Sequence, residues 1–252
     1  MPTPLSNLVD YTDRLLRHRD IADFPGALNG LQLENNGSVK KIAAAVDANI
    51  LTVEKALVAG ADLLLVHHGI GWSPLCPVTG NRRRWLASAL AGNLAIYSSH
   101  LPLDAHPRLG NNILLARSLG LLRTRPFFEE KGTLIGRQGS WSGTRTGLAA
   151  RLGGILGVRP VVLPGGPERV RRIGIVTGGA GNELVKVAAA GIDTFITGEG
   201  AHWTFGVAHE LGLNVIYGGH YLTETAGVKA LASHLSKRFH LPWLFIDVPS
   251  GL

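Results

Sequence analysis

Hydrophobic residues near the start of the chain recur at helical spacing. Leu5, Leu8, Val9, Leu15 and Leu16 fall on roughly one face of a helix. Beyond them, short apolar runs alternate with longer stretches in which apolar and polar residues mix at helical spacing. This alternation is typical of parallel sheets built from β-α-β units.

The alternation divides the chain into two similar parts. In the first part we expect strands at 42–46, 63–66 and 94–98, and helices at 51–58, 83–90 and 113–119. In the second part we expect strands at 133–137, 173–176, 194–197, 214–217 and 244–248, and helices at 184–190, 205–211 and 226–239. The pattern predicts an α/β fold of two α/β domains with largely parallel sheets, an N-terminal half at 1–125 and a C-terminal half at 126–252.

Composition fits an ordinary globular protein. A chain of 252 residues with 45% hydrophobic content can bury one large core or two small ones. No apolar run approaches the roughly 20 residues of a membrane-spanning helix, and the first residues lack the pattern of a secretory signal. A single cysteine, Cys76, cannot form an internal disulfide. We therefore expect a cytoplasmic protein without a membrane partner.

Basic residues outnumber acidic ones, 25 to 18. Arginines are concentrated at 82–84, at 123 and 125, and at 169, 171 and 172. Such a surplus attracts phosphates, nucleotides or nucleic acid, although charge runs of this size are also common on solvated surfaces. No aromatic residues interleave with the arginines as in a nucleic-acid stacking platform. A phosphate-bearing small molecule is therefore a better candidate partner than nucleic acid.

Candidate chemistry gathers where predicted strands end. His67 and His68 directly follow the apolar run at 63–66, and His100 follows the run at 94–98, with Asp104 four residues later. In open parallel sheets, ligands bind at the carboxyl ends of the strands, where loops converge. These side chains are therefore candidates for one site.

The same pattern returns late in the chain, where His220 and Glu224 follow the run at 214–217. A lone histidine is more often a hydrogen-bonded loop or core residue, but recurrence at several strand ends favours a metal site. Mixed nitrogen and oxygen ligands suit Zn, Fe, Mn, Co or Ni better than Ca or Mg. Adjacent histidines in an extended segment point in different directions and could address two neighbouring ions.

Several segments together resemble the Nif-three-like family, whose members are also called dinuclear metal-centre hexameric proteins or GTP cyclohydrolase type 2 homologues. The segments are HHG at 67–69, SHLPLDAHP at 99–107, GNN at 110–112, TGE at 197–199 and GHYLTE at 219–224. The likeness extends from NGLQ at 29–32 to FIDVP at 245–249. The chain departs from many relatives after the histidine pair, where GIGW at 69–72 replaces proline or an aromatic residue.

The resemblance implies two metal ions per chain in the cleft between the two domains. Their implied ligands are His67 and His220 for one ion, His68 and Asp104 for the other, and Glu224 as the bridge. His100 matches a histidine close to the centre in similar proteins, for which we expect a positioning or proton-transfer role. The resemblance also implies a toroidal homohexamer whose metal sites face the inner cavity.

Two metals can activate water and clamp the oxygens of a displacement reaction, so the implied chemistry is hydrolysis of a nucleotide or phosphate-bearing substrate. A non-enzymatic ring that stores, delivers or senses metal, or that binds a partner or nucleic acid, is the alternative. Serine or thiol hydrolysis has little support, since the chain lacks a Gly-x-Ser-x-Gly element and a cysteine nucleophile motif.

Two further features are open to either interpretation. The segment TGGAG at 177–181 lies between a predicted strand and helix, and it either cradles phosphate on its N–H groups or forms a tight turn. Glu199 follows a predicted strand, and it either lines the cleft or is an exposed loop acid.

Overall fold

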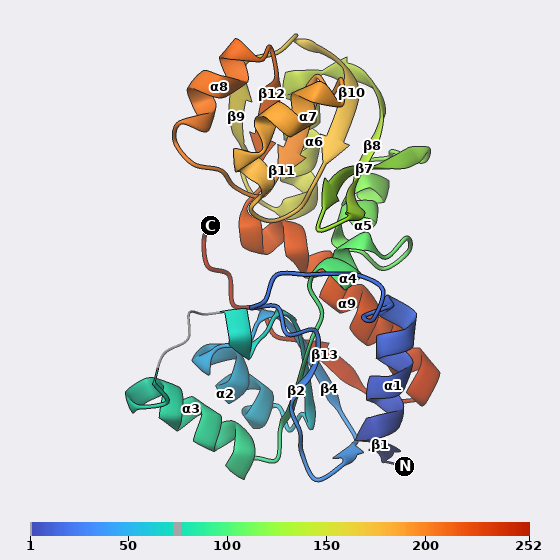
Figure 1. Ribbon diagram of the computed structural model, residues 1–252, viewed down its shortest axis with the longest axis vertical. Coiled ribbons are helices and arrows are strands. Elements are labelled where there is room, and N and C mark those ends of the chain that lie inside the picture. The colour runs from blue at the N-terminus through green and yellow to red at the C-terminus, as the bar shows by residue number, and fades with distance from the viewer. Residues whose placement is uncertain (1, 73–76) are drawn as a thin grey trace. The chain divides into compact units, whose positions relative to one another are not determined.

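The computed structural model describes residues 2–72 and 77–252, which form two compact units (Figure 1). Unit 1 comprises Met1–Leu103 and Gly227–Val248, and unit 2 comprises Asp104–Ala226 and Pro249–Leu252. The units thus interleave along the sequence, in contrast to the consecutive halves expected at 1–125 and 126–252. Cys76 lies outside the described residues.

Unit 1 is built on a sheet with the order β13-β4-β5-β6-β2. Its strands are β13 (Trp243–Phe245), β4 (Ile42–Asp47), β5 (Leu63–His68), β6 (Ala95–Ser98) and β2 (Gly30–Leu33). Neighbours are parallel except β2, which runs antiparallel to β6. A separate antiparallel pair joins β1 (Thr3–Pro4) to β3 (Ser38–Val39).

The helices of unit 1 include the three that were expected, near the start of the chain, at 51–58 and at 83–90, together with two short ones that were not. They are α1 (Leu5–Leu16), α2 (Ile50–Val58), α3 (Gly80–Ala91), the short η1 (Ile70–Trp72), and α4 (Leu101–Ala105), which ends beyond the unit boundary. Helix α2 begins after Asn49, whose side chain accepts hydrogen bonds from the backbone of Leu51 and Thr52, while Thr52 caps the Asn49 N–H in return. This capping box satisfies backbone donors that would otherwise lack partners.

Unit 2 contains a sheet with the order β7-β8-β10-β11-β12-β9. Its strands are β7 (Thr124–Glu130), β8 (Thr133–Thr144), β10 (Arg169–Ile175), β11 (Thr194–Thr197), β12 (Asn214–Tyr217) and β9 (Val161–Pro164). Strands β10, β11 and β12 are parallel, whereas the flanking pairings are antiparallel. The helices are α5 (Asn111–Ser118), α6 (Arg145–Leu156), the short η2 (Ala180–Asn182), α7 (Leu184–Ala189), α8 (Thr204–Glu210), and α9 (His220–Phe239), which continues into unit 1.

Each unit has its own hydrophobic core. In unit 1, alanine and branched side chains of β4, β5 and β6 pack against Val53 and Ala56 of α2 and Ala89 of α3. In unit 2, Leu148 and Leu152 of α6 pack with the isoleucines of β10, β11 and β12. Burying these apolar side chains is the main force that holds the parallel strands in register.

The α/β class and the strongest apolar runs are confirmed, but several elements differ from expectation. The expected strand at 244–248 is the shorter β13, and it pairs with β4 of unit 1. Helix α9 begins at His220, before the expected start at 226. Strand β7 was not expected, and β8 extends beyond the expected strand at 133–137. Many residues of these two strands are exposed, so their apolar residues give only a weak periodic pattern.

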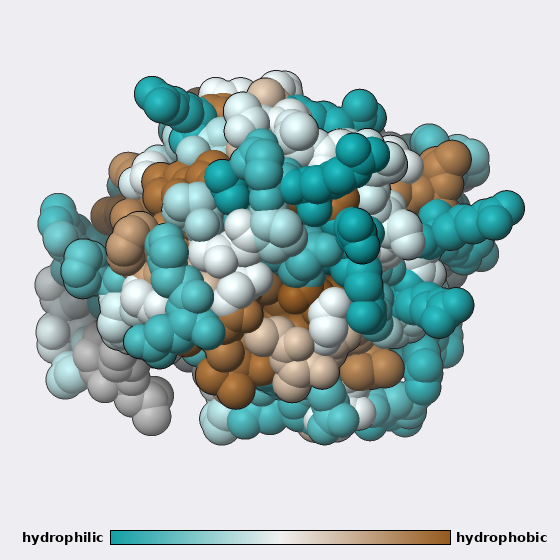
Figure 2. Space-filling model, turned by 90° about the horizontal axis from the view of Figure 1, so that it is seen from above, coloured by the Kyte–Doolittle hydropathy of each residue, from teal (hydrophilic) through white to brown (hydrophobic). Residues whose placement is uncertain are grey.

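The arginine clusters lie at the surface, where only Arg82 is partly buried. Figure 2 shows one face of the protein, over which hydrophilic side chains project between hydrophobic patches. Within the described residues, no helix has the length and apolar character needed to cross a bilayer.

Candidate metal centre

Three buried histidines meet at the carboxyl ends of two neighbouring strands in unit 1. His67 and His68 are the last residues of β5, and His100 lies two residues after β6. Because β5 and β6 are parallel neighbours, with Val66 opposite Ser98, these ends lie together. One nitrogen from each of the three rings lies within 4.8 Å of the others. This group could hold a metal ion.

His67 and His68 are both oriented by hydrogen bonds at Nδ1. The partner of His67 is the carbonyl oxygen of Ser99, at 2.9 Å, and the partner of His68 is Oδ1 of Asp47, also at 2.9 Å. An acceptor at Nδ1 selects the tautomer with its hydrogen there, which leaves the Nε2 lone pair for a metal. Asp47 pairs with His68 across β4 and β5, so the sheet register itself supplies this partner.

His100 is held by a buried carboxylate. Its Nδ1 lies 2.8 Å from Oδ1 of Asp23, and the side chain of Asp23 is only 6% exposed. Asp23 also accepts hydrogen bonds from the backbone N–H groups of Phe24 and Leu101 and from the side chain of Asn29. Burial raises the pKa of Asp23, but the hydrogen bond and charge of His100 and the other donors outweigh it, so the pKa lies below its usual value.

Aromatic side chains cover this histidine group. The Trp72 ring stacks on His68 with centroids 4.8 Å apart and contacts His100 at 4.4 Å, while Phe24 meets Trp72 edge-on at 6.4 Å. Trp72 belongs to the GIGW segment at 69–72, which follows the histidine pair. Apolar rings beside the histidines limit solvent access and strengthen electrostatic interactions there.

Unit 2 contributes a histidine and a carboxylate from one helical turn. His220 begins α9 and Glu224 follows four residues later, so both lie on the same helix face. Nε2 of His220 lies 3.2 Å from Oε2 of Glu224, and Nδ1 lies 2.7 Å from Oε1 of Glu199. Burial lowers the pKa of His220, but the carboxylates of Glu224 and then Glu199 outweigh it and raise the pKa to about 9.

The glycine-rich segment at 177–181 packs against Glu224. A Cβ on Gly178 would lie 2.1 Å from Oε1 of Glu224, and Gly178 has a φ of +72°. Its N–H donates to Oγ1 of Thr223, and the N–H of Gly181 donates to the carbonyl of Glu199. These N–H groups are therefore engaged within the protein, which favours the tight turn over the phosphate cradle.

Asp104 is buried and oriented by an amide. It is 4% exposed, and its Oδ1 accepts a hydrogen bond of 2.9 Å from Nδ2 of Asn111, the first residue of α5. Asn111 is itself fully buried. An oriented, buried carboxylate is suited to metal ligation, because little ordering remains to be done when an ion binds.

Within each unit, the structure brings some of the predicted residues together. Unit 1 brings together His67, His68 and His100, unit 2 brings together His220 and Glu224, and Asp104 pairs with Asn111. Buried imidazole nitrogens and carboxylate oxygens match the ligands preferred by Zn, Fe, Mn, Co and Ni. The donor set therefore fits divalent transition metals.

Sequence reasoning missed the residues that orient the histidines. Asp47 ends an apolar strand and could have been found by the same pattern that identified the candidate ligands. Asp23 lies in a loop far from His100 in sequence, and no spacing indicates their contact. Glu199, left open between cleft residue and loop acid, is the hydrogen-bond partner of His220.

Comparison with known proteins decides the family. The family model described as Duf34/NIF3 (NGG1p interacting factor 3) matches residues 4–250. The chain belongs to the DUF34/NIF3 family. This confirms the resemblance to the Nif-three-like family over nearly the whole chain.

Relatives in this family match along nearly their full length. Proteins called "GTP cyclohydrolase 1 type 2 homolog" are 40% identical in Deinococcus radiodurans, covering 97% of this chain and 93% of the relative, and 38% identical in Pseudomonas aeruginosa, covering 99% of each. The crystal structure of TTHA1606 from Thermus thermophilus superposes with a TM-score of 0.91 at 43% identity, over 99% of this chain and 100% of that one. The fold described above is therefore the DUF34/NIF3 fold.

Proposed function

We propose that this DUF34/NIF3 protein binds two divalent transition-metal ions and uses them to hydrolyse a nucleotide or another phosphate-bearing substrate. The observation that carries the proposal is the orientation of the buried histidines. His67, His68 and His220 each engage an acceptor through Nδ1, which fixes the direction in which each ring presents Nε2. This is the arrangement in which metal-ligating histidines are usually held.

By the family resemblance, His67 and His220 would hold one ion and His68 and Asp104 the other. Glu224 would be a ligand to both. A carboxylate has two oxygens and can contact two ions at once. The assignment follows the family resemblance, and the buried, oriented state of Asp104 and Glu224 supports it.

When bound, a pair of such ions acidifies water and stabilises charge on phosphate oxygens. The protein supplies the remaining groups. Asp23 accepts the Nδ1 hydrogen of His100, so that Nε2 of His100 can accept a proton and later return it. Trp72 covers His68 and His100 and keeps bulk water from them.

The substrate class is suggested by charge and by relatives. The chain is basic overall, with 25 lysines and arginines against 18 acidic residues, which favours anionic ligands. Because relatives carry the name "GTP cyclohydrolase 1 type 2 homolog", GTP is the first compound to test, through hydrolytic opening of its imidazole ring.

Activity should depend on the metals and on Asp104. We expect purified protein to hydrolyse at least one compound in a screen of GTP ring opening and of phosphate mono- and diesters. Chelation should abolish the reaction and the proper metal should restore it. Asp104→Ala should lower turnover by about two orders of magnitude or more, since loss of one ligand disrupts one of the two ions.

Asp10→Ala is the matched control, because Asp10 is an exposed acid on α1 and takes no part in the proposed centre. If wild type and the Asp104 variant gave equal rates on every substrate, the hydrolysis would come from a contaminant. The protein would then be a metal-binding protein without this activity.

A further inference from the structure

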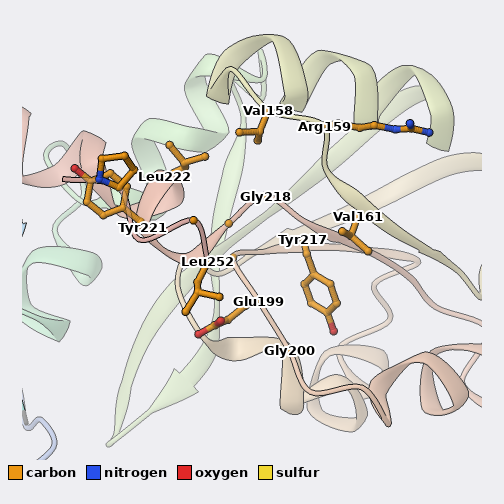
Figure 3. Close-up of a pocket in the computed structure, with 14 residues that line it drawn as sticks. Val158, Arg159, Val161, Glu199, Gly200, Tyr217, Gly218, Tyr221, Leu222 and Leu252 are labelled. Atoms are coloured by element: carbon orange, nitrogen blue, oxygen red, sulfur yellow. The ribbon is translucent and has the colours of Figure 1, made fainter. Parts of the chain in front are cut away.

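Unit 2 contains a pocket beside the residues that precede His220. Its volume is about 510 Å³, and Figure 3 shows the side chains that line it. We call it the β9–β12 pocket. It is defined here by Val158, Val161, Glu199, Tyr217, Leu222 and Leu252. Pockets of about 300 to 1,000 Å³ accommodate small organic ligands, so the volume suits a two-ring heterocycle with attached sugar.

One wall of the pocket is formed by a valine and a tyrosine. Val161 of β9 lies directly opposite Tyr217 of β12 in the antiparallel pairing, so both side chains lie on the same face of the sheet. The Tyr217 hydroxyl is fixed by a 2.7 Å hydrogen bond to Oγ1 of Thr204, which holds the ring in place. Figure 3 shows Val161 and the Tyr217 ring next to each other. A planar ligand ring can pack on these two side chains, and the Tyr217 ring is already held in place before the ligand binds.

Glu199 is the acidic residue among those that line the β9–β12 pocket. Its Oε1 accepts the hydrogen bond from Nδ1 of His220 at 2.7 Å. No described residue donates to Oε2, and the side chain is 45% exposed. Oε2 is therefore positioned to accept an N–H from a ligand while Oε1 keeps hold of His220.

We propose that the β9–β12 pocket binds a purine base of the guanine type, with Glu199 accepting its N–H groups and Tyr217 and Val161 packing on its ring. Guanine presents a ring N–H and an amino group side by side, and Oε2 of Glu199, with two lone pairs, can accept from both. Adenine places a ring acceptor beside its amino group, and that lone pair faces the carboxylate unfavourably. The inference rests on the proposed function, for which it names the base of the substrate.

The decisive measurement is the affinity for nucleosides, which carry no phosphate that could bind to metals. Isothermal titration calorimetry of the metal-loaded protein should give a dissociation constant for guanosine at least about tenfold lower than that for adenosine. Hydrogen bonds to a charged group discriminate strongly between ligands that can and cannot donate them. Inosine, which lacks the amino group, should fall between them. Glu199→Gln should weaken guanosine binding by about tenfold or more.

A second variant avoids the contact between Glu199 and His220. Val161→Trp should block the pocket and abolish guanosine binding with unchanged metal content. Val185→Trp is its control, because Val185 is an exposed valine of α7 in the same unit and lies outside the pocket. Equal affinities for guanosine and adenosine, or guanosine binding unaffected by both pocket variants, would overturn the proposal.

Two further outcomes separate this inference from the proposed function. If metal-dependent hydrolysis is found but guanosine does not bind, the base site is wrong and the function stands. If guanosine binds as expected but no compound is hydrolysed, the function is wrong and the base site stands. If Val161→Trp changes the mass in light scattering and wild type does not bind guanosine, the pocket is a contact between copies, which would also overturn the proposal.

Discussion

Side chains that orient other side chains decide the chemistry of this protein at the residue scale. His68, His100 and His220 each engage a carboxylate through Nδ1, at 2.9, 2.8 and 2.7 Å. These partners fix the ring orientation of each histidine and favour a hydrogen on its Nδ1. Replacing the partners should therefore change the behaviour of the histidines without removing them.

Metal content should respond differently to the loss of the bridge and of a terminal ligand. Wild type should bind about two transition-metal ions per chain by elemental analysis. Glu224→Ala should lose most of both ions, because its carboxylate is the proposed bridge, whereas His68→Ala should lose chiefly one. A Glu224→Ala protein with full metal content and unchanged affinity would refute the bridging role.

Asp23→Asn should lower turnover at least about tenfold with metal content retained. The amide carries no charge to stabilise a protonated His100, and its NH2 group faces donors that Asp23 accepts from.

The stability of wild type relative to Asp23→Asn should also change with pH. The pKa of Asp23 is depressed in the folded state, so its stabilisation is present above the usual value of 3.8 and is lost as the pH falls through the folded value. Urea denaturation of the metal-free proteins should therefore show a difference that shrinks in acid. A constant difference across this range would contradict the argument.

At the scale of elements, strand ends and helix starts bring the candidate ligands into place. The ends of β5 and β6 carry the histidines of unit 1, and the first turn of α9 places His220 and Glu224 on one helix face. The turn after β10 approaches Glu224 so closely that Gly178 leaves no space for a side chain. Backbone geometry thus controls the position of this carboxylate.

Gly178→Ala should displace Glu224 and reduce metal content, in addition to destabilising the fold. The new Cβ would collide with Glu224, and a positive φ is unfavourable for alanine. Gly206→Ala is the matched control, because a Cβ at that helical position meets nothing within 4 Å. The control should keep its metal and be as stable as wild type or slightly more so. Equal metal content in both variants would show that the turn does not position Glu224.

At the scale of the whole molecule, we predict by family resemblance that the chains assemble into a homohexamer. Light scattering should detect it as a mass about six times the 26.8 kDa of the chain. The measurement should be repeated after chelation, to learn whether assembly needs the metals. A clean monomer at micromolar concentration would exclude functions that depend on an enclosed cavity.

The course of the chain through the two units shows what periodicity cannot reveal. The apolar run near residue 244 was correctly expected to be a strand, but β13 pairs with β4, about two hundred residues earlier in the chain. Apolar spacing reports which face of an element is buried, and it carries no information about which distant strand becomes its neighbour. Unit boundaries therefore depended on the tertiary structure.

The sequence alone determined the α/β class, the main strands and the candidate ligands. Apolar runs that are followed within three residues by His67, His100 and His220 identify strand ends, and parallel strands present their carboxyl ends at one edge of each sheet. Only the tertiary structure decided which groups orient the histidines. Asp23 and His100 lie 77 residues apart, and Glu199 and His220 lie 21 apart. Such hydrogen bonds form between segments that packing brings together, so no local pattern of residues predicts them.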